Sequence, residues 1–421
     1  MSKFVLRNAN LLDLEEGALI DGMDVVVIDD KIADIGRGLV DPVGTDAVYD
    51  LRGLTLMPGL IDCHVHVTAS HVNLGLAAKL PNALGVIRSL PILRGMLNRG
   101  FTSVRDAGGG DWALAQAAQD GLIEAPRLFP SGKALSQTGG HGDFRARSDQ
   151  LEPCACSFRI GNIARVVDGV DDVRRAARDE LTKGATQIKV MASGGVTSPN
   201  DPIGNTGYSM DELRAIVDEA AAWQTYVMAH AYTPRAIKRA VQAGVRTIEH
   251  GNLIDEATAR LVKEAGVFVV PTLITFDMLS SEGAALGLPP ESIAKVDDVR
   301  LIGREAIAML HRLGVKMGFG SDLLGESHKH QSEELRIRSE IVGNLETLRS
   351  ATTVAADILQ RAGILGVVRP GAIADLLVVK GNPLKDIGVL TGQGEGLAAI
   401  MKDGRFVRNE FEARPSAALV A

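Results

Sequence analysis

Short apolar runs alternate with amphipathic helical stretches along the chain between residues 57 and 368. Repeated runs of strand length, each followed by a helical stretch, are typical of a parallel sheet covered by helices. The runs end near His66, Asp106, Lys133, Met191, His230, His250, Thr272 and Asp322. Eight such runs predict an α/β fold in the form of a closed (β/α)8 TIM barrel.

Two of the helical stretches carry their own boundary signals. Ser209 and Glu212 have the spacing of a capping box, and apolar positions then recur every three and four residues over residues 213–221. Residues 171–181 are also amphipathic and end near Gly184, a residue type that commonly stops helices. We expect a helix to begin at the first site and another to end at the second.

Both ends of the chain have a β pattern. Residues 1–56 contain short strand-like runs, with Asp29-Asp30 marking a hairpin, and residues 369–421 repeat the strand-turn-strand character. Two terminal β segments around a central domain most simply pair with each other. The predicted organisation is a small β-sandwich from residues 1–56 and 369–421, and a barrel over residues 57–368.

Two predicted connections are longer than a barrel requires. One covers about residues 135–163 and contains the Gly139-Gly-His-Gly-Asp143 segment. The other covers about residues 276–293 and includes two glycines and the Pro289-Pro290 pair. Long loops of this kind usually belong to the active-site face, so both are candidate lids.

The composition places the protein among soluble globular chains. The 421 residues are 46% hydrophobic and 23% charged, with a formal net charge of −7. Mild acidity without a Lys/Arg-rich block argues against nucleic acid or anionic membrane as a partner. The chain has no apolar run of roughly 20 residues and no signal-peptide pattern at its start, which favours a cytoplasmic location.

Three cysteines, Cys63, Cys154 and Cys156, do not form a disulfide framework, and their odd number fits a reducing compartment. Cys154 and Cys156 have no second cysteine pair with which to complete a thiolate metal site. A plain surface loop is the better interpretation of that segment.

His64 and His66 end the first apolar run. Side chains two residues apart on a strand point to the same face, so both imidazoles can reach one divalent ion. A pair of core histidines is an equally good interpretation of this motif in isolation.

Further polar residues stand at later strand ends. Lys189 lies within an apolar run, where an ammonium must be paired, pKa-shifted, chemically modified or directed to solvent. His230, His250 and Asp322 each close another run. A hydrogen-bonded structural role suits any one of these histidines, but six potential ligands at five strand ends together predict a metal site.

With these residues in place, the chain resembles the metal-dependent amidohydrolase superfamily along nearly its whole length. It is most similar to the imidazolonepropionase-like peptidase branch, which includes Xaa-Pro, Xaa-Arg and Xaa-Lys dipeptidases and amidases that hydrolyse ochratoxin A. The resemblance rests on residues 56–66, 102–109, 189–196, 230–232, 248–251 and 320–322.

The resemblance implies two Zn2+ per chain. His64, His66 and Asp322 would hold one ion, His230 and His250 the other, and Lys189, carboxylated by CO2, would bridge them. Two such ions lower the pKa of a bridging water and polarise the scissile carbonyl. Asp322 would then carry the proton to the leaving amine. Related enzymes form large homo-oligomers, so a homo-oligomer is expected.

His141 and Tyr232 are the remaining catalytic candidates. In the resembled branch a histidine like His141 assists the substrate carbonyl, whereas a solvated loop histidine is the alternative. Tyr232 is placed to donate a hydrogen bond to an oxyanion, and packing under the barrel rim is its alternative role.

Several residues are candidates for substrate contacts. The amides of Gly194, Gly195 and Val196 are candidates to bind a substrate carboxylate, as are the loop cations Lys329 and Arg105. Alternatively, Arg105 simply pairs with Asp106 inside the barrel. His328 and His330 suit a substrate-facing loop or a solvated helix start better than a second metal site.

The predicted function is a zinc-dependent amidohydrolase that cleaves the amide bond of N-acyl amino acids or dipeptides by attack of a metal-bridging hydroxide. Small amide or dipeptide substrates are expected because two long loops would cap the barrel mouth. The alternative is a cyclic amide or amidine hydrolase, or a deaminase. A non-catalytic scaffold fits poorly because it would be expected to have lost ligands.

Overall fold

The computed structural model describes residues 2–40, 44–145, 159–198, 201–288 and 290–413. By its internal contacts the chain divides into two compact units. The first consists of Met1–Ile61, Met96–Ser103 and Leu335–Ala421, and the second of Asp62–Gly95 and Val104–Glu334. Each unit has a hydrophobic cluster of its own.

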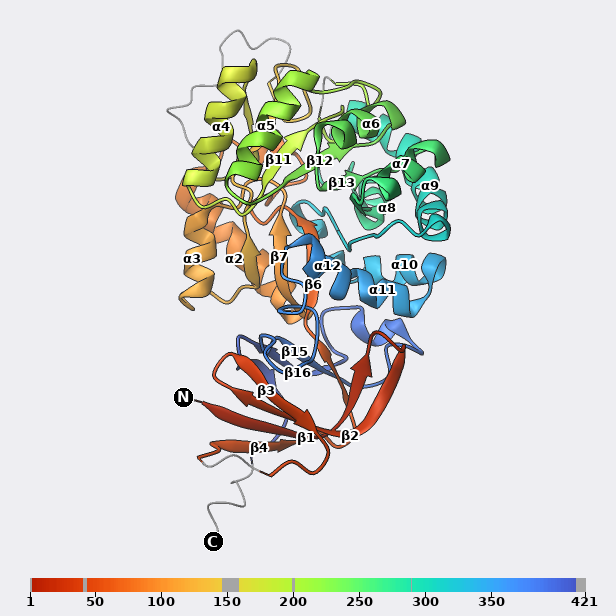
Figure 1. Cartoon of the computed structure of the whole chain (residues 1–421). Coiled ribbons are helices and arrows are strands. Elements are labelled where there is room, and N and C mark those ends of the chain that lie inside the picture. The colour runs from red at the N-terminus through yellow and green to blue at the C-terminus, as the bar shows by residue number, and fades with distance from the viewer. Residues whose placement is uncertain (1, 41–43, 146–158, 199–200, 289, 414–421) are drawn as a thin grey trace. The chain divides into compact units, whose positions relative to one another are not determined.

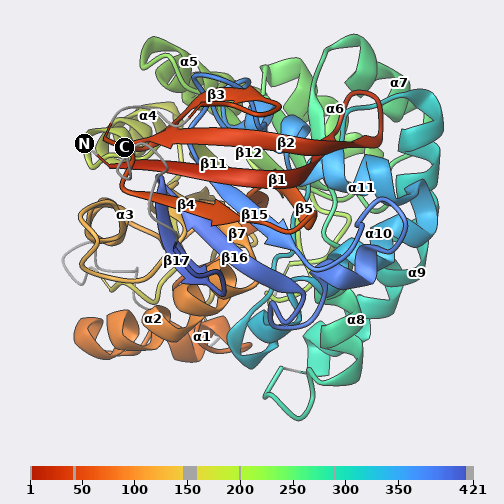
Figure 2. The same cartoon turned by 90° about the horizontal axis from the view of Figure 1, so that it is seen from below.

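The first unit is built on one eight-stranded sheet with the order β17-β16-β15-β5-β1-β2-β3, and β4 also pairs with β1 (Figure 2). Its strands are β1 (Lys3–Asp13), β2 (Ala18–Ile28), β3 (Lys31–Gly36), β4 (Ala47–Asp50), β5 (Thr55–Pro58), β15 (Leu376–Val379), β16 (Leu397–Lys402) and β17 (Arg405–Asn409).

Strands from both ends of the chain meet in this sheet. β5 pairs antiparallel with β15, which joins the N-terminal strands to the C-terminal ones. The β2–β3 hairpin turns at the predicted position, where Asp29 has a φ of 53°. The predicted pairing of the two terminal segments is therefore confirmed.

Six parallel strands lie in the second unit and pair in the order β10-β9-β11-β12-β13-β14. Three more strands pair in the order β6-β7-β8, and the division between the units falls within β6 and β7. Their bounds are β6 (Leu60–Val65), β7 (Phe101–Asp106), β8 (Arg127–Phe129), β9 (Ala134–Ser136), β10 (Ala164–Val166), β11 (Ile188–Met191), β12 (Val227–Ala231), β13 (Thr247–His250) and β14 (Phe268–Val270). The predicted α/β class is confirmed.

Helices follow the strands along the chain, and α4, α5 and α6 run beside β11–β13 in Figure 1. The helices are α1 (Leu74–Ala77), α2 (Asn82–Asn98), α3 (Trp112–Gln119), α4 (Val170–Thr182), α5 (Met210–Ala222), α6 (Pro234–Ala243), α7 (Glu256–Glu264), α8 (Leu273–Ser281), α9 (Pro290–Leu313), α10 (Glu333–Val342), α11 (Asn344–Ser350) and α12 (Thr353–Ile358), with 3-10 turns η1 (Gly325–His330) and η2 (Ile387–Leu390).

Both predicted helix signals are confirmed. Ser209 and Glu212 form the capping box that starts α5. The amphipathic stretch forms α4, and the chain turns at Gly184, which has a φ of 91°.

Two of the eight expected strands differ from the prediction. The run expected to end near Lys133 is split into β8 and β9, because Pro130 has no amide hydrogen and Gly132 has a φ of 66°. The run expected to end at Asp322 forms only an isolated parallel bridge between Val269 and Met317. Gly320 lies in this run. A Cβ atom on Gly320 would lie 2.9 Å from His64 Cβ, so the close approach of this backbone to His64 requires a residue without a side chain.

The second predicted lid is mostly helical. α8 occupies its beginning and α9 starts at Pro290, which corrects the expectation of a long loop over residues 276–293. Apolar residues of α8 such as Phe276 and Leu279 are buried, which explains why the segment folds as a helix. Pro289 lies outside the described residues, as do residues 146–158 of the first predicted lid, which include Cys154 and Cys156.

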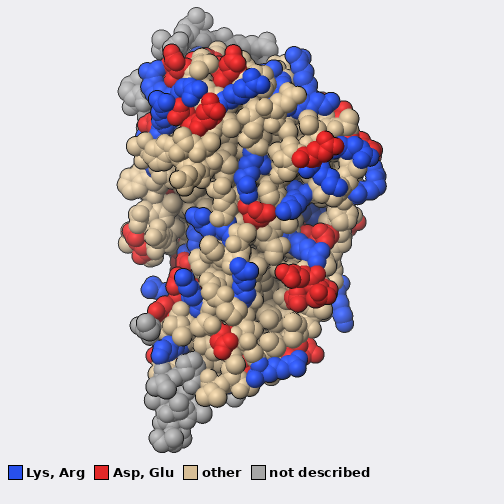
Figure 3. All heavy atoms as spheres, viewed as in Figure 1, with Lys and Arg blue, Asp and Glu red and all other residues tan. Residues whose placement is uncertain are grey.

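Charges of both signs are interspersed over the face drawn in Figure 3, without a large patch of one sign. Within the described ranges, none of the helices has the length and apolar character that crossing a bilayer requires.

Candidate metal centre

The polar residues predicted at strand ends lie at one edge of the parallel strands. His64 lies in β6, Lys189 in β11, His230 in β12 and His250 at the end of β13. The parallel register pairs Ala231 with His250, so neighbouring strands end at a similar level. The carboxyl ends of parallel strands are where such folds place their chemistry.

Asp322 lies among three imidazoles. Its Oδ1 is 3.4 Å from His64 Nε2 and 3.2 Å from His66 Nε2, and its Oδ2 is 3.9 Å from His250 Nδ1. Asp322 (φ 52°) and His250 (φ 70°) both have left-handed backbones. Such conformations cost of order 1–3 kcal/mol each and cluster at functional sites.

Glu249 orients the His64 ring. His64 Nδ1 lies 2.7 Å from Glu249 Oε2, and Arg105 donates to both oxygens of the same carboxylate at 2.9 and 3.1 Å. Burial raises the pKa of Glu249, but the Arg105 charge and the His64 hydrogen bond lower it to about 2. A charged acceptor keeps the proton on His64 Nδ1 and leaves Nε2 with its lone pair.

The other imidazoles are also held by hydrogen bonds. His66 Nδ1 lies 3.0 Å from the Gly108 carbonyl oxygen, and His250 Nδ1 lies 2.8 Å from Thr272 Oγ1. His230 Nε2 lies 3.1 Å from the carbonyl oxygen of Gly194. In each case one ring nitrogen is engaged and the other remains for a ligand.

The protonation states of His230, His250 and Asp322 suit metal binding, whereas at His66 burial lowers the pKa but Asp322 raises it above the ordinary histidine value. Burial, reinforced by neighbouring positive charge, lowers the pKa of His230 and His250 well below the ordinary histidine value, although Asp322 opposes this at His250. Burial raises the pKa of Asp322, but His64 and His66 bring it well below its usual range. Neutral imidazoles and an anionic carboxylate are the forms that bind metals.

Lys189 is 1% exposed. Among the residues that the structure describes, its ammonium makes no hydrogen bond or ion pair. Burial lowers its pKa to about 8, while the charges of Glu249 and Asp322 oppose that shift. An isolated buried ammonium is costly, so the burial of Lys189 disfavours its charged form.

The residues present fit a divalent metal ion. His64, His250 and Asp322 each offer one ligand atom, and these atoms lie within 4.8 Å of one another. His64 Nε2 is buried and has no hydrogen-bond partner in the described part of the chain. Imidazoles combined with a carboxylate form a donor set that is typical of zinc.

Both predicted catalytic side chains lie against these histidines. The rings of His141 and His230 are stacked with centroids 4.3 Å apart, and the Tyr232 ring lies 4.9 Å from His230 and 5.1 Å from His250. Burial raises the pKa of Tyr232 well above its ordinary value, so its phenol remains a hydrogen-bond donor.

The glycine amides after β11 are already engaged. Gly194 N donates to the Asn205 carbonyl at 3.0 Å, and Gly195 N donates to Asp201 Oδ2 at 2.8 Å. In this structure both amides are occupied by protein acceptors, and their binding of a substrate carboxylate stays a prediction. Val196 is buried in an apolar cluster that also contains Phe276.

His328 and His330 lie on η1. His328 is buried with Nε2 3.2 Å from the Ala69 carbonyl oxygen, which corrects the picture of a solvated helix start. His330 Nε2 lies 3.3 Å from Glu282, and Lys329 Nζ lies 4.0 Å from the same carboxylate. A substrate contact for either histidine stays a prediction.

The predicted pairing of Arg105 with Asp106 is wrong. Successive residues on a strand point to opposite faces, and the two side chains bind different groups. Arg105 is fully buried against Glu249, which also removes it as a loop cation for a substrate. Asp106 accepts hydrogen bonds from the amides of Val67, Gly108 and Gly110.

Two buried carboxylates that support the ligands were not predicted. One is Glu249, and the other is Asp62, which accepts from the amides of His64 and Ser321 at 3.0 and 3.2 Å and from Gln331 Nε2 at 2.9 Å. The signal was present in the sequence, because each is a charged residue inside an apolar strand, where it requires a partner.

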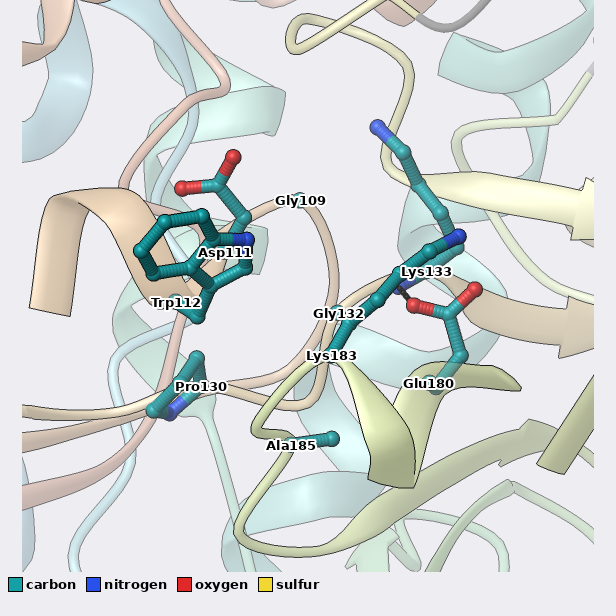
Figure 4. Close-up of a pocket in the computed structure, with 9 residues that line it drawn as sticks. All are labelled: Gly109, Asp111, Trp112, Pro130, Gly132, Lys133, Glu180, Lys183 and Ala185. Carbon is teal, nitrogen blue, oxygen red and sulfur yellow. Dashed lines mark hydrogen bonds between the residues drawn. The ribbon is translucent and has the colours of Figure 1, made fainter. Parts of the chain in front are cut away.

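A separate cavity of about 370 Å3 lies beside α3 (Figure 4). Trp112 and Pro130 line one side, and Lys133, Glu180 and Lys183 the other. Glu180 accepts from the Lys133 amide at 3.0 Å. None of the predicted metal ligands lines this cavity, so it does not bear on their chemistry.

The sequence model of the amidohydrolase family matches residues 55–407. The chain belongs to the amidohydrolase family. This amidohydrolase is therefore a hydrolase that acts on C–N bonds, and its family neighbours imply a TIM barrel with an additional domain.

Three relatives illustrate the branch. The amidohydrolase is 32% identical to ochratoxinase from Aspergillus niger over 97% of this chain and 87% of the relative. It is 61% identical to a crystal structure of a prolidase complexed with N-methylphosphonate-L-proline, with a TM-score of 0.95, covering 97% of this chain and all of the other. A Xaa-Pro dipeptidase structure with bound methionine is 28% identical, with a TM-score of 0.86 and coverage of 97% and 100%. The predicted superfamily branch is confirmed.

Proposed function

We propose that this amidohydrolase binds two zinc ions and cleaves the amide bond of dipeptides or N-acyl amino acids, with acyl-proline amides as its first candidate substrates. The observation that carries the proposal is the 61% identity to a prolidase complexed with a phosphonate of proline. A phosphonate on the proline nitrogen is tetrahedral, like the intermediate formed when water adds to an acyl-proline carbonyl.

The proposed architecture is the closed (β/α)8 barrel. Backbone hydrogen bonds continue past the assigned strands: Cys63 N donates to Phe319 O at 2.8 Å, and Gly318 N to Val269 O at 2.9 Å. Thr186 N donates to Pro130 O at 2.8 Å. These bonds support closure of the parallel strands into one barrel over residues 57–368, with residues 1–56 and 369–421 forming the β-sandwich domain.

His64, His66 and Asp322 would hold one ion, and His230 and His250 the other. Lys189 would bridge them as a carbamate, which converts a buried cation into an anionic two-oxygen ligand. This assignment is supported by the burial of Lys189 and by its lack of an ion pair among the described residues. Two bound ions would supply Lewis acidity toward the carbonyl and lower the pKa of water.

The protein's own groups would handle the proton and the substrate. The Asp322 carboxylate, held anionic, accepts a proton from the attacking water and delivers it to the leaving nitrogen. Tyr232 donates a hydrogen bond to the developing oxyanion, and His141, stacked on His230, contacts the substrate carbonyl. Phe276 and Val196 belong to the same buried apolar cluster as Tyr232, which would limit the access of water to the site.

An ochratoxin-type amide is the second candidate substrate. The similarity to ochratoxinase extends over 97% of the chain, and the Phe276 and Tyr232 rings lie with centroids 6.1 Å apart beside the metal ligands. Aromatic rings in such a position suit an aromatic acyl group.

The test is a hydrolysis panel with the zinc-loaded protein. It should compare Xaa-Pro, Xaa-Arg and Xaa-Lys dipeptides, an N-acyl-proline, ochratoxin A and a cyclic amide, scored by the amino acid released. We expect an acyl-proline or another acyl amino acid to have the highest kcat/KM. Turnover of the cyclic amide alone would overturn the proposal.

A further inference from the structure

Ser198 and Asp201, two buried residues that follow β11, contact the His141 ring. His141 Nδ1 lies 2.7 Å from Ser198 Oγ and 3.5 Å from Asp201 Oδ2. Asp201 is 2% exposed and also accepts from Gly195 N at 2.8 Å. Both contacts engage Nδ1, so Nε2 is the ring nitrogen of His141 that remains for a ligand.

The His141 ring packs directly against the backbone of Gly195. A Cβ atom at this position would lie 2.0 Å from His141 Cε1 and 2.2 Å from its Nδ1. Because no side chain fits in that space, the ring position depends on where the Gly195 backbone is held. A shift of the Gly195 backbone would therefore move the imidazole.

Lys295, on α9, holds that backbone. Its Nζ donates to the carbonyl oxygens of Gly195 at 3.0 Å, Ser198 at 2.8 Å and Asp201 at 2.8 Å. An ammonium has three N–H donors, and these three acceptors satisfy all of them. The three carbonyls belong to the same residues that contact His141.

We propose that Lys295 is a positioning residue for His141. By binding the three carbonyls, Lys295 fixes the Gly195 backbone and the Asp201 carboxylate. These two groups keep the His141 imidazole stacked on His230. Removing the ammonium leaves three carbonyls without their shared donor, so the loop relaxes and the ring loses its fixed place. The effect on turnover rests on the proposed role of His141 in catalysis, whereas the effect on the ring does not.

The ring position can be measured without any substrate. Diethyl pyrocarbonate labels accessible neutral imidazoles, and peptide mass spectrometry of the metal-loaded chain reports the rate at each histidine. His311, which is exposed on α9, serves as the internal reference. We expect Lys295→Met to raise the labelling rate of His141 relative to His311 by about threefold or more, as a locally opened site should. Lys263→Met, which removes an exposed lysine on α7, is the matched control and should change nothing.

Kinetics with the best substrate of the panel then distinguish positioning from general stability. Lys295→Met should lower kcat about ten- to hundredfold, because a ring misplaced by about 1 Å loses its geometry. In a His141→Ala background the same change should cost no more than about a further twofold. Lys295→Arg, which keeps the charge and several donors, should recover part of the rate.

Unchanged His141 labelling in Lys295→Met overturns the inference whatever the activity. So does a loss of kcat that is as large in the His141→Ala background as in the wild type. If the wild type hydrolyses no member of the panel, the proposed function fails, while the labelling still decides the role of Lys295.

Discussion

The imidazole of His141 lies nearly parallel to that of His230, with ring centroids 4.3 Å apart and planes inclined by 21°. His230 is a proposed metal ligand at the end of β12, and His141 comes from a loop about ninety residues earlier. The contact places His141, which does not lie on a strand, next to the proposed metal ligands. The position of the His141 ring depends on the Gly195 backbone against which it packs.

Gly195→Ala should displace His141, because the new methyl group would overlap the ring at 2.0 Å from Cε1. We expect kcat to fall by about a hundredfold or more, as for a misplaced catalytic group. Gly204→Ala is the matched control, since nothing lies within 4 Å of a Cβ atom there. Equal kcat values for the two variants would show that the position of His141 does not limit turnover.

Asp322→Asn should separate metal binding from proton transfer. An amide oxygen can still contact a metal, but it cannot carry the proton to the leaving nitrogen. We expect most of the metal to remain while kcat falls by about two to four orders of magnitude. Metal content and kcat measured on the same preparation check this, and near-normal turnover would make His141 the next candidate for the acid/base group.

Glu249→Gln should change how the free energy of unfolding depends on pH. Burial raises the pKa of Glu249, but Arg105 and His64 hold it at about 2, below its ordinary value of 4.5. The stabilisation from this carboxylate is therefore complete at neutral pH, and it is lost as the pH falls from about 4.5 toward about 2. At pH 7 the variant should lose about 3–5 kcal/mol, because it leaves Arg105 buried without its charged partner.

The difference in Tm between wild type and Glu249→Gln should consequently narrow between pH 7 and pH 3.5. Glu264→Gln, at an exposed position on α7, should leave Tm unchanged at both values. A difference of the same size at both pH values would show that the charge of Glu249 is not the source of its stabilisation.

Lys189→Ala should lose both metal and activity, because the proposed bridge is missing. Short carboxylic acids added with zinc should restore part of the activity, since they supply the two oxygens of a carbamate. Metal analysis and kcat with and without added acid are the measurements. A Lys189→Ala variant that keeps its metal and its turnover would exclude the bridge.

The sequence predicted the residues at the ends of regular strands well, because a strand fixes the direction of each side chain. A period of two along each strand and a common edge of the parallel strands account for the positions of His64, His66, His230 and His250. The pairing of the two terminal β segments followed from the same patterns. The split at Gly132 was not expected, although Pro130 and Gly132 are the residues that cause it.

Contacts that depend on the tertiary fold could not be predicted. Arg105 pairs with Glu249 across the unit, 144 residues away, whereas the sequence suggested its neighbour Asp106. Two further sets of hydrogen bonds arise only when separate elements pack together. The amides of Gly194 and Gly195 donate to acceptors that follow later in the chain, and Lys295 donates to three carbonyls that lie 94–100 residues earlier. Local patterns carry no information about such partners.

Metal content measured together with activity tests the central claim most directly. The metal-free protein should be reconstituted with increasing zinc, and hydrolysis of the best acyl amino acid should be measured at each ratio. The proposed centre predicts that activity rises until about two ions are bound per chain, as expected for a two-metal site. Full activity with one tightly held ion, or without any, would contradict it.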